Sequence, residues 1–329
     1  MTGHWAFRVA STPEVGGGHI ARCRAVAEAM SGHATVVFVL DPEGSAWKSR
    51  LEQVGITAIC EGEDEPKDWV GCLMDGYHFS EADATNWRRK TGWLAFVDDF
   101  GTPLHTADLA VAPSFSPDAV ADIGIPYLAG PQYAMISAAF ARLFPPQIKD
   151  DIGHLLISFG LRDSRNATSL VLDAIDSMEV ADRLHGITVA LGTQAPHRPA
   201  VVKKIDDLSK EVKVTSEQDD FLSLMTEADM VIGAGGVSLF ERMASARPSI
   251  TLTTAENQEP SAWAAGRAGA TLYLADCQNI EAIFLTRHLD DFVSNIDLRQ
   301  KMSEKARDFV DGKGAVRISE ALLKLSSVH

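Results

Sequence analysis

Short apolar segments alternate with amphipathic segments along most of the chain. In the first half each apolar run ends at Gly, Asp or Pro, as buried parallel strands do. These runs cover residues 33–40, 55–62, 70–77, 93–100 and 107–113, and the first strand is expected before them at 5–11. Residues 19–31 place Ile20, Cys23, Ala27 and Met30 at helical spacing. The alternation of strand and helix predicts a parallel α/β sheet over the first half.

The same pattern restarts after residues 143–153, where two prolines and a charged stretch predict a linker. Further strands are expected at 154–160, 186–192, 211–216, 229–236, 249–254 and 270–275, and helices at 169–178, 219–227, 237–246 and 259–268. Two successive arrays predict an α/β protein with two doubly wound, Rossmann-like domains that face one another across a cleft. We place these domains at residues 1–146 and 147–329.

The length and composition of the chain agree with two domains and argue against nucleic acid and membranes as partners. The chain has 329 residues, of which 46% are apolar, enough for two domains with large cores. A formal net charge of −15 disfavours nucleic acid as a partner, because phosphates would be repelled. No apolar stretch approaches the roughly 18 residues of a membrane helix, and no secretion-type leader opens the chain. We therefore expect a cytoplasmic protein with no membrane partner.

The cysteines show neither CxxC spacing nor the density of a disulfide scaffold, so we expect buried free thiols. No HExxH motif or Cys/His pairing points to a metal, and no GxSxG elbow points to acyl hydrolysis. The sequence therefore predicts neither a metal site nor a cofactor.

The first loop with chemical character is EVGGGHIARC, residues 14–23, which follows the first strand. Loops at the carboxyl ends of parallel strands are where such sheets bind ligands. The glycine run 16–18 allows close approach of the backbone, and a helix that begins at Gly18 or His19 would attract an anion. His19 would stand at the mouth of that site with Arg22 beside it. A lone histidine is more often structural, but this one follows a glycine loop at a strand tip.

A second candidate is VIGAGGVSLFERMASARPSI, residues 231–250, which contains a strand, a glycine turn and an amphipathic helix. Gly235 and Gly236 would bring N–H groups against a diphosphate at the start of that helix, and Ser238 would add a hydroxyl donor. Glu241 would accept both hydrogen bonds from a ribose diol. The motif is neither GxGxxG nor a P-loop, and a tight turn with a solvated glutamate explains it about equally well.

Three more loops carry weaker signals. Gly160 opens the first turn of the second half, in LISFGLRDS, where Ser158 and Asp163 can also be helix caps. Asn257 follows the strand at 249–254, where an amide can orient a sugar hydroxyl or only cap the loop. Tyr77 follows a strand in MDGYHF and is also explained as a partly buried aromatic residue.

Taken together, these motifs resemble a known family. They are FRVASTPEVGGGHIARCRAVAEAM, LMDGYHF, FVDDF, ADLAVAP, YLAGPQYAMI, LLISFGLRDSRNAT, ADMVIGAGGVSLFERMASARPSI and ENQ. Their order, from residue 7 to about 275, is similar to that of the UDP-sugar hydrolase family of pseudaminic acid biosynthesis, which acts on UDP-2,4-diacetamido-2,4,6-trideoxy-β-L-altropyranose. The resemblance implies the GT-B fold of MurG-like glycosyltransferases and a role in nonulosonic acid biosynthesis and flagellin glycosylation.

The resemblance also implies metal-free cleavage of the anomeric C1–O bond by water, with inversion, releasing UDP and the free sugar. His19 matches the catalytic histidine, which would orient or deprotonate the water, while Tyr77 and Asn257 would position the water and the sugar. The N-terminal domain would hold the sugar and the C-terminal domain would bind UDP. The expected substrate-binding residues are Gly16, Gly17, Gly18, Arg22, Gly160, Phe221, Gly235, Gly236, Ser238, Glu241 and Gln258.

The sequence departs from the family pattern at several positions. Ala10 stands where an acidic residue is usual, Leu161 and Arg162 replace a small pair, and Gly76 replaces a bulkier polar residue. The exact sugar therefore stays open. Two alternatives share the same motifs: a GT-B glycosyltransferase, in which a sugar acceptor replaces water, and a non-catalytic protein that binds a nucleotide sugar. In each case the expected partner is a UDP-sugar or UDP, and no protein partner is indicated.

Overall fold

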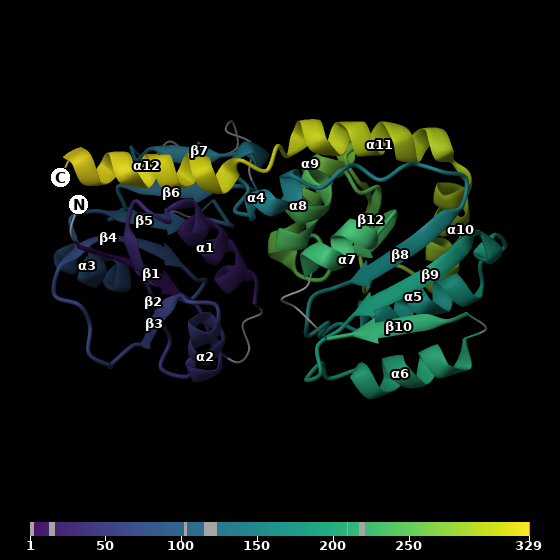
Figure 1. The fold of residues 1–329 in the computed structure, drawn as a ribbon, viewed down its shortest axis with the longest axis horizontal. Helices are drawn as coiled ribbons and strands as arrows, with labels where there is room; N and C mark the ends of the chain where they lie inside the picture. The colour runs from purple at the N-terminus through teal and green to yellow at the C-terminus, as the bar shows by residue number, and fades with distance from the viewer. Residues whose placement is uncertain are drawn as a thin grey trace. The chain divides into compact units, whose positions relative to one another are not determined.

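The computed structural model describes residues 3–12, 17–101, 104–114, 124–208, 210–216 and 221–328. The chain divides into two compact units. Unit 1 comprises Met1–Ala138 and Lys313–His329, and unit 2 comprises Ala139–Gly312. Each unit is built on a parallel sheet with helices between the strands (Figure 1), which confirms the α/β class expected from the sequence.

Unit 1 holds a seven-stranded sheet in the order β3-β2-β1-β4-β5-β6-β7. Its elements are β1 (His4–Val9), α1 (Gly18–Ala29), β2 (Thr35–Leu40), α2 (Ser45–Gln53), β3 (Thr57–Cys60), β4 (Trp69–Asp75), α3 (Glu81–Lys90), β5 (Leu94–Val97), β6 (Leu109–Ala112), β7 (Tyr127–Ala129) and α12 (Gly314–Val328). The strand order reverses between β1 and β4, so the carboxyl ends of these two neighbours form the switch point where open sheets bind ligands.

Successive side chains of β4 face opposite sides of this sheet. Leu73 packs in the core that α1 and α12 cover, whereas Met74 packs with Trp87 of α3 on the other side. Asp75 follows Leu73 by two residues and ends the strand. It therefore continues the row that faces α1.

The C-terminal helix α12 corrects the expected domain division. We expected residues 313–329 in the second domain, but they belong to unit 1, and the expected boundary at 146/147 falls inside unit 2. The cause is an apolar stripe: Ala315, Ile318 and Leu322 of α12 are buried in the same core as Ile20 of α1. Figure 1 shows the two helices side by side.

Unit 2 holds a six-stranded sheet in the order β10-β9-β8-β11-β12-β13, which reverses between β8 and β11. Its elements are β8 (Ile152–Ser158), α5 (Ala167–Asp176), β9 (Leu184–Ala190), α6 (Arg198–Asp207), β10 (Val212–Thr215), α7 (Phe221–Glu227), β11 (Met230–Gly233), α8 (Val237–Ala244), β12 (Ser249–Thr253), α9 (Glu259–Ala268), β13 (Leu272–Asp276), α10 (Ala282–Ser294) and α11 (Ile296–Phe309). The short helix α4 (Ala138–Ala141) crosses the division between the units.

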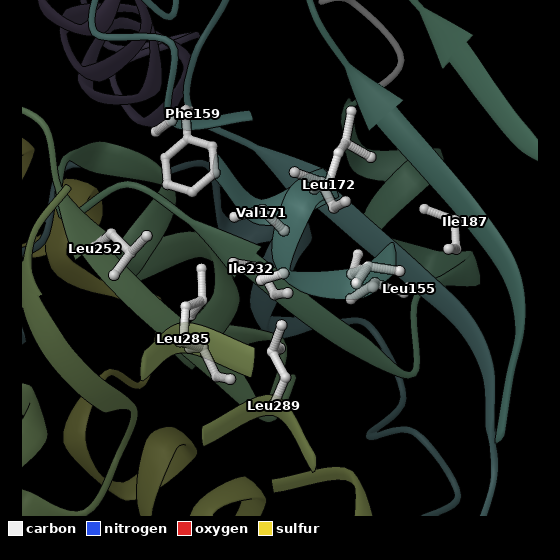
Figure 2. Close-up of a cluster of buried hydrophobic side chains, with 14 of the residues drawn as sticks. Leu155, Phe159, Val171, Leu172, Ile187, Ile232, Leu252, Leu285 and Leu289 are labelled. Atoms are coloured by element: carbon white, nitrogen blue, oxygen red, sulfur yellow. The ribbon is translucent and has the colours of Figure 1, made fainter. Parts of the chain in front are cut away.

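The core of unit 2 joins strands to helices far apart in sequence. Ile232 of β11 and Leu252 of β12 pack with Leu285 and Leu289 of α10 and with Val171 of α5 (Figure 2). These side chains form the apolar layer beneath the strands whose carboxyl ends carry the candidate loops.

Two further expectations concern the whole chain. All four cysteines are free and buried, as expected. Within the described part of the chain, no helix has the length and apolar character needed to cross a bilayer.

Candidate active site

His19 and Asp75 form a buried pair at the switch point of unit 1. His19 lies in the first turn of α1, and its Nδ1 is 2.7 Å from Oδ1 of Asp75 at the end of β4. Asp75 is 0% exposed and His19 only 7%. An ionised carboxylate can only accept a hydrogen bond, so we assign the imidazole proton to Nδ1. In the neutral imidazole this tautomer leaves Nε2 without a proton, so Nε2 can accept one from a nucleophile.

Arg22, one turn further along α1, binds the same carboxylate. Its Nε donates to Oδ2 of Asp75 at 2.6 Å and its Nη2 to Oδ1 at 2.5 Å, a bidentate pair. Burial alone would raise the pKa of Asp75, but Arg22 and His19 hold that pKa well below its usual value. Asp75 therefore stays ionised at neutral pH.

Tyr77 covers one side of His19. The two rings meet edge to face with centroids 4.6 Å apart, and the Tyr77 hydroxyl donates to Oδ2 of Asp99 at 2.9 Å. The same Asp99 oxygen accepts from Nη1 of Arg22 at 2.7 Å. Partial burial and the Asp99 carboxylate raise the pKa of Tyr77 well above its usual value, so its hydroxyl remains a donor. Within unit 1 the structure thus brings together the predicted catalytic residues His19 and Tyr77.

Asp75 and Asp99 were not among the expected site residues. Their signal is an aspartate directly after a buried strand run, in LMD and FVDD. Arg22 was expected to contact substrate, but it is 8% exposed and its Nε, Nη1 and Nη2 are engaged by the two aspartates. In this structure the guanidinium organises the other site residues.

The glycine run before His19 is described only in part. Gly16 lies outside the described residues. Gly17 is the N-cap of α1 and Gly18 is its first residue; no described side chain caps this helix start, and its first turn contains no acidic residue. These features suit the expected attraction of an anion to the helix N-terminus.

The glycine turn between β11 and α8 differs in one detail from expectation. The N–H of Gly235 donates to Oε1 of Gln258 at 3.2 Å, so that donor is already engaged within unit 2. The same Gln258 oxygen accepts from the N–H of Thr254 at 2.9 Å. Gln258 therefore ties together the loops after β11 and β12. Gly236 is the N-cap of α8 and has no side-chain cap.

The remaining predicted site residues of unit 2 lie on several separate helices and loops. Glu241 lies one turn into α8 and is half-buried, and Asn257 is half-buried in the 3₁₀ turn at Glu256–Gln258. Gly160 follows β8, is exposed, and has a φ of +84°. Phe221 is the first residue of α7, and the centroid of its ring lies 6.3 Å from that of Phe140. Phe221 therefore packs against another aromatic side chain.

Asp163, near Gly160, acts as a helix cap. Its carboxylate accepts from the N–H groups of Ala167 and Thr168 at the start of α5, at 2.9 Å each. The capping interpretation of this residue is therefore confirmed. Among the described residues, no group of three or more His, Cys, Asp or Glu side chains is placed to hold a metal ion.

Known proteins resemble the chain in fold more than in sequence. No known protein-family profile matches it. The spore coat polysaccharide biosynthesis protein SpsG of Bacillus subtilis is 29% identical over 198 residues, which cover 60% of this chain and 58% of SpsG. The match thus spans less than two thirds of that curated relative.

Among solved structures, MurG of Acinetobacter baumannii matches with a TM-score of 0.69 at 13% identity, over 98% of this chain and 99% of MurG. The chain has the GT-B fold. A UDP-GlcNAc 2-epimerase from Neisseria meningitidis, solved with UDP-GlcNAc bound, matches with a TM-score of 0.61 at 14% identity, over 98% of this chain and all (100%) of the epimerase. The expected MurG-like architecture is thereby confirmed.

Proposed function

We propose that the protein breaks the anomeric C–O bond of a nucleotide-linked sugar, with His19 as the general base for a hydroxyl nucleophile. The observation that carries this proposal is the buried His19–Asp75 pair, which leaves Nε2 of the imidazole to accept a proton. The nucleophile gives its proton to Nε2 while its oxygen bonds to C1, and the nucleoside diphosphate leaves with the electron pair. Asp75 stabilises the imidazolium that forms.

The nucleotide is proposed to be UDP, held by unit 2. This assignment is supported by the fold shared with an epimerase that was solved with UDP-GlcNAc bound. The start of α8, at Gly236 and Ser238, would bind the diphosphate and stabilise its developing charge as it leaves, and Glu241 would hold the ribose. Unit 1 would hold the sugar and supply the base.

Two nucleophiles are supported by different observations. The GT-B fold shared with MurG-like glycosyltransferases favours a sugar hydroxyl, which would make the protein a glycosyltransferase, and the likeness to SpsG, a polysaccharide biosynthesis protein, agrees with this. The ordered motifs between residues 7 and 275 favour water, which makes it a hydrolase of a UDP-2,4-diacetamido-2,4,6-trideoxy sugar. In the second case Tyr77 and Asn257 would position the water and the sugar.

The test is UDP release from a panel of UDP-sugars, including UDP-GlcNAc and UDP-2,4-diacetamido sugars, with and without a panel of sugar acceptors. Release at enzyme-like rates without acceptor identifies water as the nucleophile. Release that depends on an acceptor identifies a glycosyltransferase. Binding of UDP with no release under any condition would contradict the enzymatic proposal and favour a binding protein.

A further inference from the structure

Arg242 of α8 is buried beneath the loop that joins β11 to this helix. Its Nη2 donates to the Ala234 carbonyl at 2.9 Å and to Oγ1 of Thr251 at 3.0 Å, and its Nη1 donates to Oγ of Ser238 at 3.2 Å. The residue is 0% exposed, and its Nε has no hydrogen-bond partner among the described residues. Each acceptor that the described residues offer to this guanidinium is neutral.

A buried cation is normally paired with an anion, because its removal from water is costly. Among the described residues, only Glu241, the adjacent residue, favours the charged form, and burial still lowers the pKa of Arg242 to about 9. The loop therefore covers a positive charge to which the described part of the chain offers no hydrogen-bonded anion. An anionic ligand on the loop would provide the missing compensation, since Coulomb attraction is stronger in a medium of low dielectric.

The contact with Ser238 determines how that hydroxyl can act. A guanidinium has no acceptor, so Oγ of Ser238 must accept the bond from Arg242, and the hydroxyl hydrogen is left to donate elsewhere. Ser238 is half-buried and is the second residue of α8. The N–H groups of Val237 and Ser238 come too early in the helix to have an intrahelical acceptor, whereas that of Leu239 donates to the Gly236 carbonyl. The hydroxyl and these N–H groups are thus donors at the same helix end.

We propose that Arg242 is a positioning residue for a diphosphate bound at the N-terminus of α8. It fixes the Ser238 hydroxyl as a donor to the diphosphate, and it supplies a buried positive charge behind the loop. This inference rests on the proposed function, in which UDP occupies this loop, and it adds a residue that the glycine motif does not contain.

The test compares UDP, uridine and inorganic pyrophosphate by calorimetric titration. Arg242→Met is expected to weaken binding of UDP and pyrophosphate about tenfold or more, the order expected for a lost hydrogen bond to a charged group, with uridine binding unchanged. Ser238→Ala is also expected to weaken the binding of UDP and pyrophosphate and to leave uridine binding unchanged. It should have less effect when added to Arg242→Met, because the two residues act through one contact.

A matched control is Arg299→Met. Arg299 is also buried in unit 2. Within the described part of the chain its Nε likewise has no partner, and its other nitrogens donate only to backbone carbonyls. Its loss is expected to change stability without changing UDP affinity. Should Arg242→Met fail to fold, Ser238→Ala and Arg242→Lys carry the test, since lysine keeps the charge but lacks the planar fork.

The outcomes separate this inference from the proposed function. Two outcomes overturn the role of Arg242 without contradicting UDP binding by the protein. One is that Arg242→Met weakens the binding of UDP and of uridine equally. The other is that UDP affinity is unchanged in Arg242→Met or in Ser238→Ala. If the wild type does not bind uridine but binds pyrophosphate, and Arg242→Met weakens that pyrophosphate binding, the role of Arg242 is supported and UDP as the nucleotide is contradicted. A wild-type protein that binds none of the three ligands overturns both.

Discussion

Asp75 controls the chemical state of the residues around it. Its two oxygens accept from His19, from Arg22 and, at 3.3 Å, from the Cys23 thiol. Burial and this carboxylate raise the pKa of Cys23 well above its usual value, so the thiol remains a donor. One ionised side chain thereby fixes the proton on Nδ1 of the imidazole and keeps a neighbouring thiol inert.

Replacement of His19 tests the proposed base directly. His19→Ala is expected to lower kcat for UDP release by about 10²–10⁴-fold, the usual contribution of general acid–base catalysis. The control is His33→Ala, at an exposed position outside the site. A near-normal kcat in His19→Ala, with an unchanged melting temperature, would contradict the role of the imidazole.

Replacement of Asp75 tests the electrostatics through stability. The pKa of Asp75 in the folded protein lies below the unfolded value of about 3.9, so its stabilising effect is complete above about pH 5 and is lost as pH falls toward the folded pKa. Asp75→Asn lacks this titration. Urea unfolding midpoints measured from about pH 6 down to 2.5 should therefore fall more steeply for wild type than for the variant. Parallel curves would show that the carboxylate is not stabilised in the folded state.

At the scale of elements, α12 completes the core beside α1. Leu322 is 0% exposed and shares this core with Ile20 and Met30. Leu322→Ala is expected to lower the free energy of unfolding by about 2–5 kcal/mol, measured by urea denaturation. Lys324→Ala, on the exposed side of the same helix, should change it little. Equal effects of the two variants would mean that α12 is not packed as described.

Most strands could be predicted from the sequence because each is a single apolar run between turn residues. The expected strand at 249–254 is β12 (Ser249–Thr253), and the expected strand at 107–113 contains β6 (Leu109–Ala112). The strand β7 (Tyr127–Ala129) was missed, since three residues carry no readable period. Helices α10, α11 and α12 were also missed, because the prediction followed the strand–helix alternation and that alternation ends at β13.

The sequence predicted those residues of the candidate site that follow from local rules, but not the contacts that depend on the order of strands in the sheet. A histidine at one strand tip and a tyrosine at another follow from the rule that parallel strands share one carboxyl edge. The pairing of Arg22 with Asp75 requires β1 to lie next to β4, and this strand order is not encoded in local periodicity. The engagement of Gly235 by Gln258 depends on β11 lying next to β12 in the same way.

At the scale of the whole molecule, unit 2 is one continuous stretch of chain and unit 1 is not. The unit 2 core uses residues between Ile152 and Met302 only. A fragment 139–312 is therefore expected to unfold cooperatively on its own, monitored by circular dichroism in urea. A fragment 1–138 is expected to remain unfolded or aggregate, because it lacks α12. Cooperative unfolding of 1–138 alone would contradict this division.

The late position of α12 also sets the order in which a nascent chain can mature. The ribosome synthesises all of unit 2 before it synthesises α12, the last helix of unit 1. Unit 2 can therefore fold while unit 1 still lacks α12. Because α12 must close a loop that spans the whole of unit 2, early folding of that insert shortens the effective loop and eases the closure. Chains arrested before residue 313 are accordingly expected to contain a protease-resistant unit 2 beside a protease-sensitive unit 1.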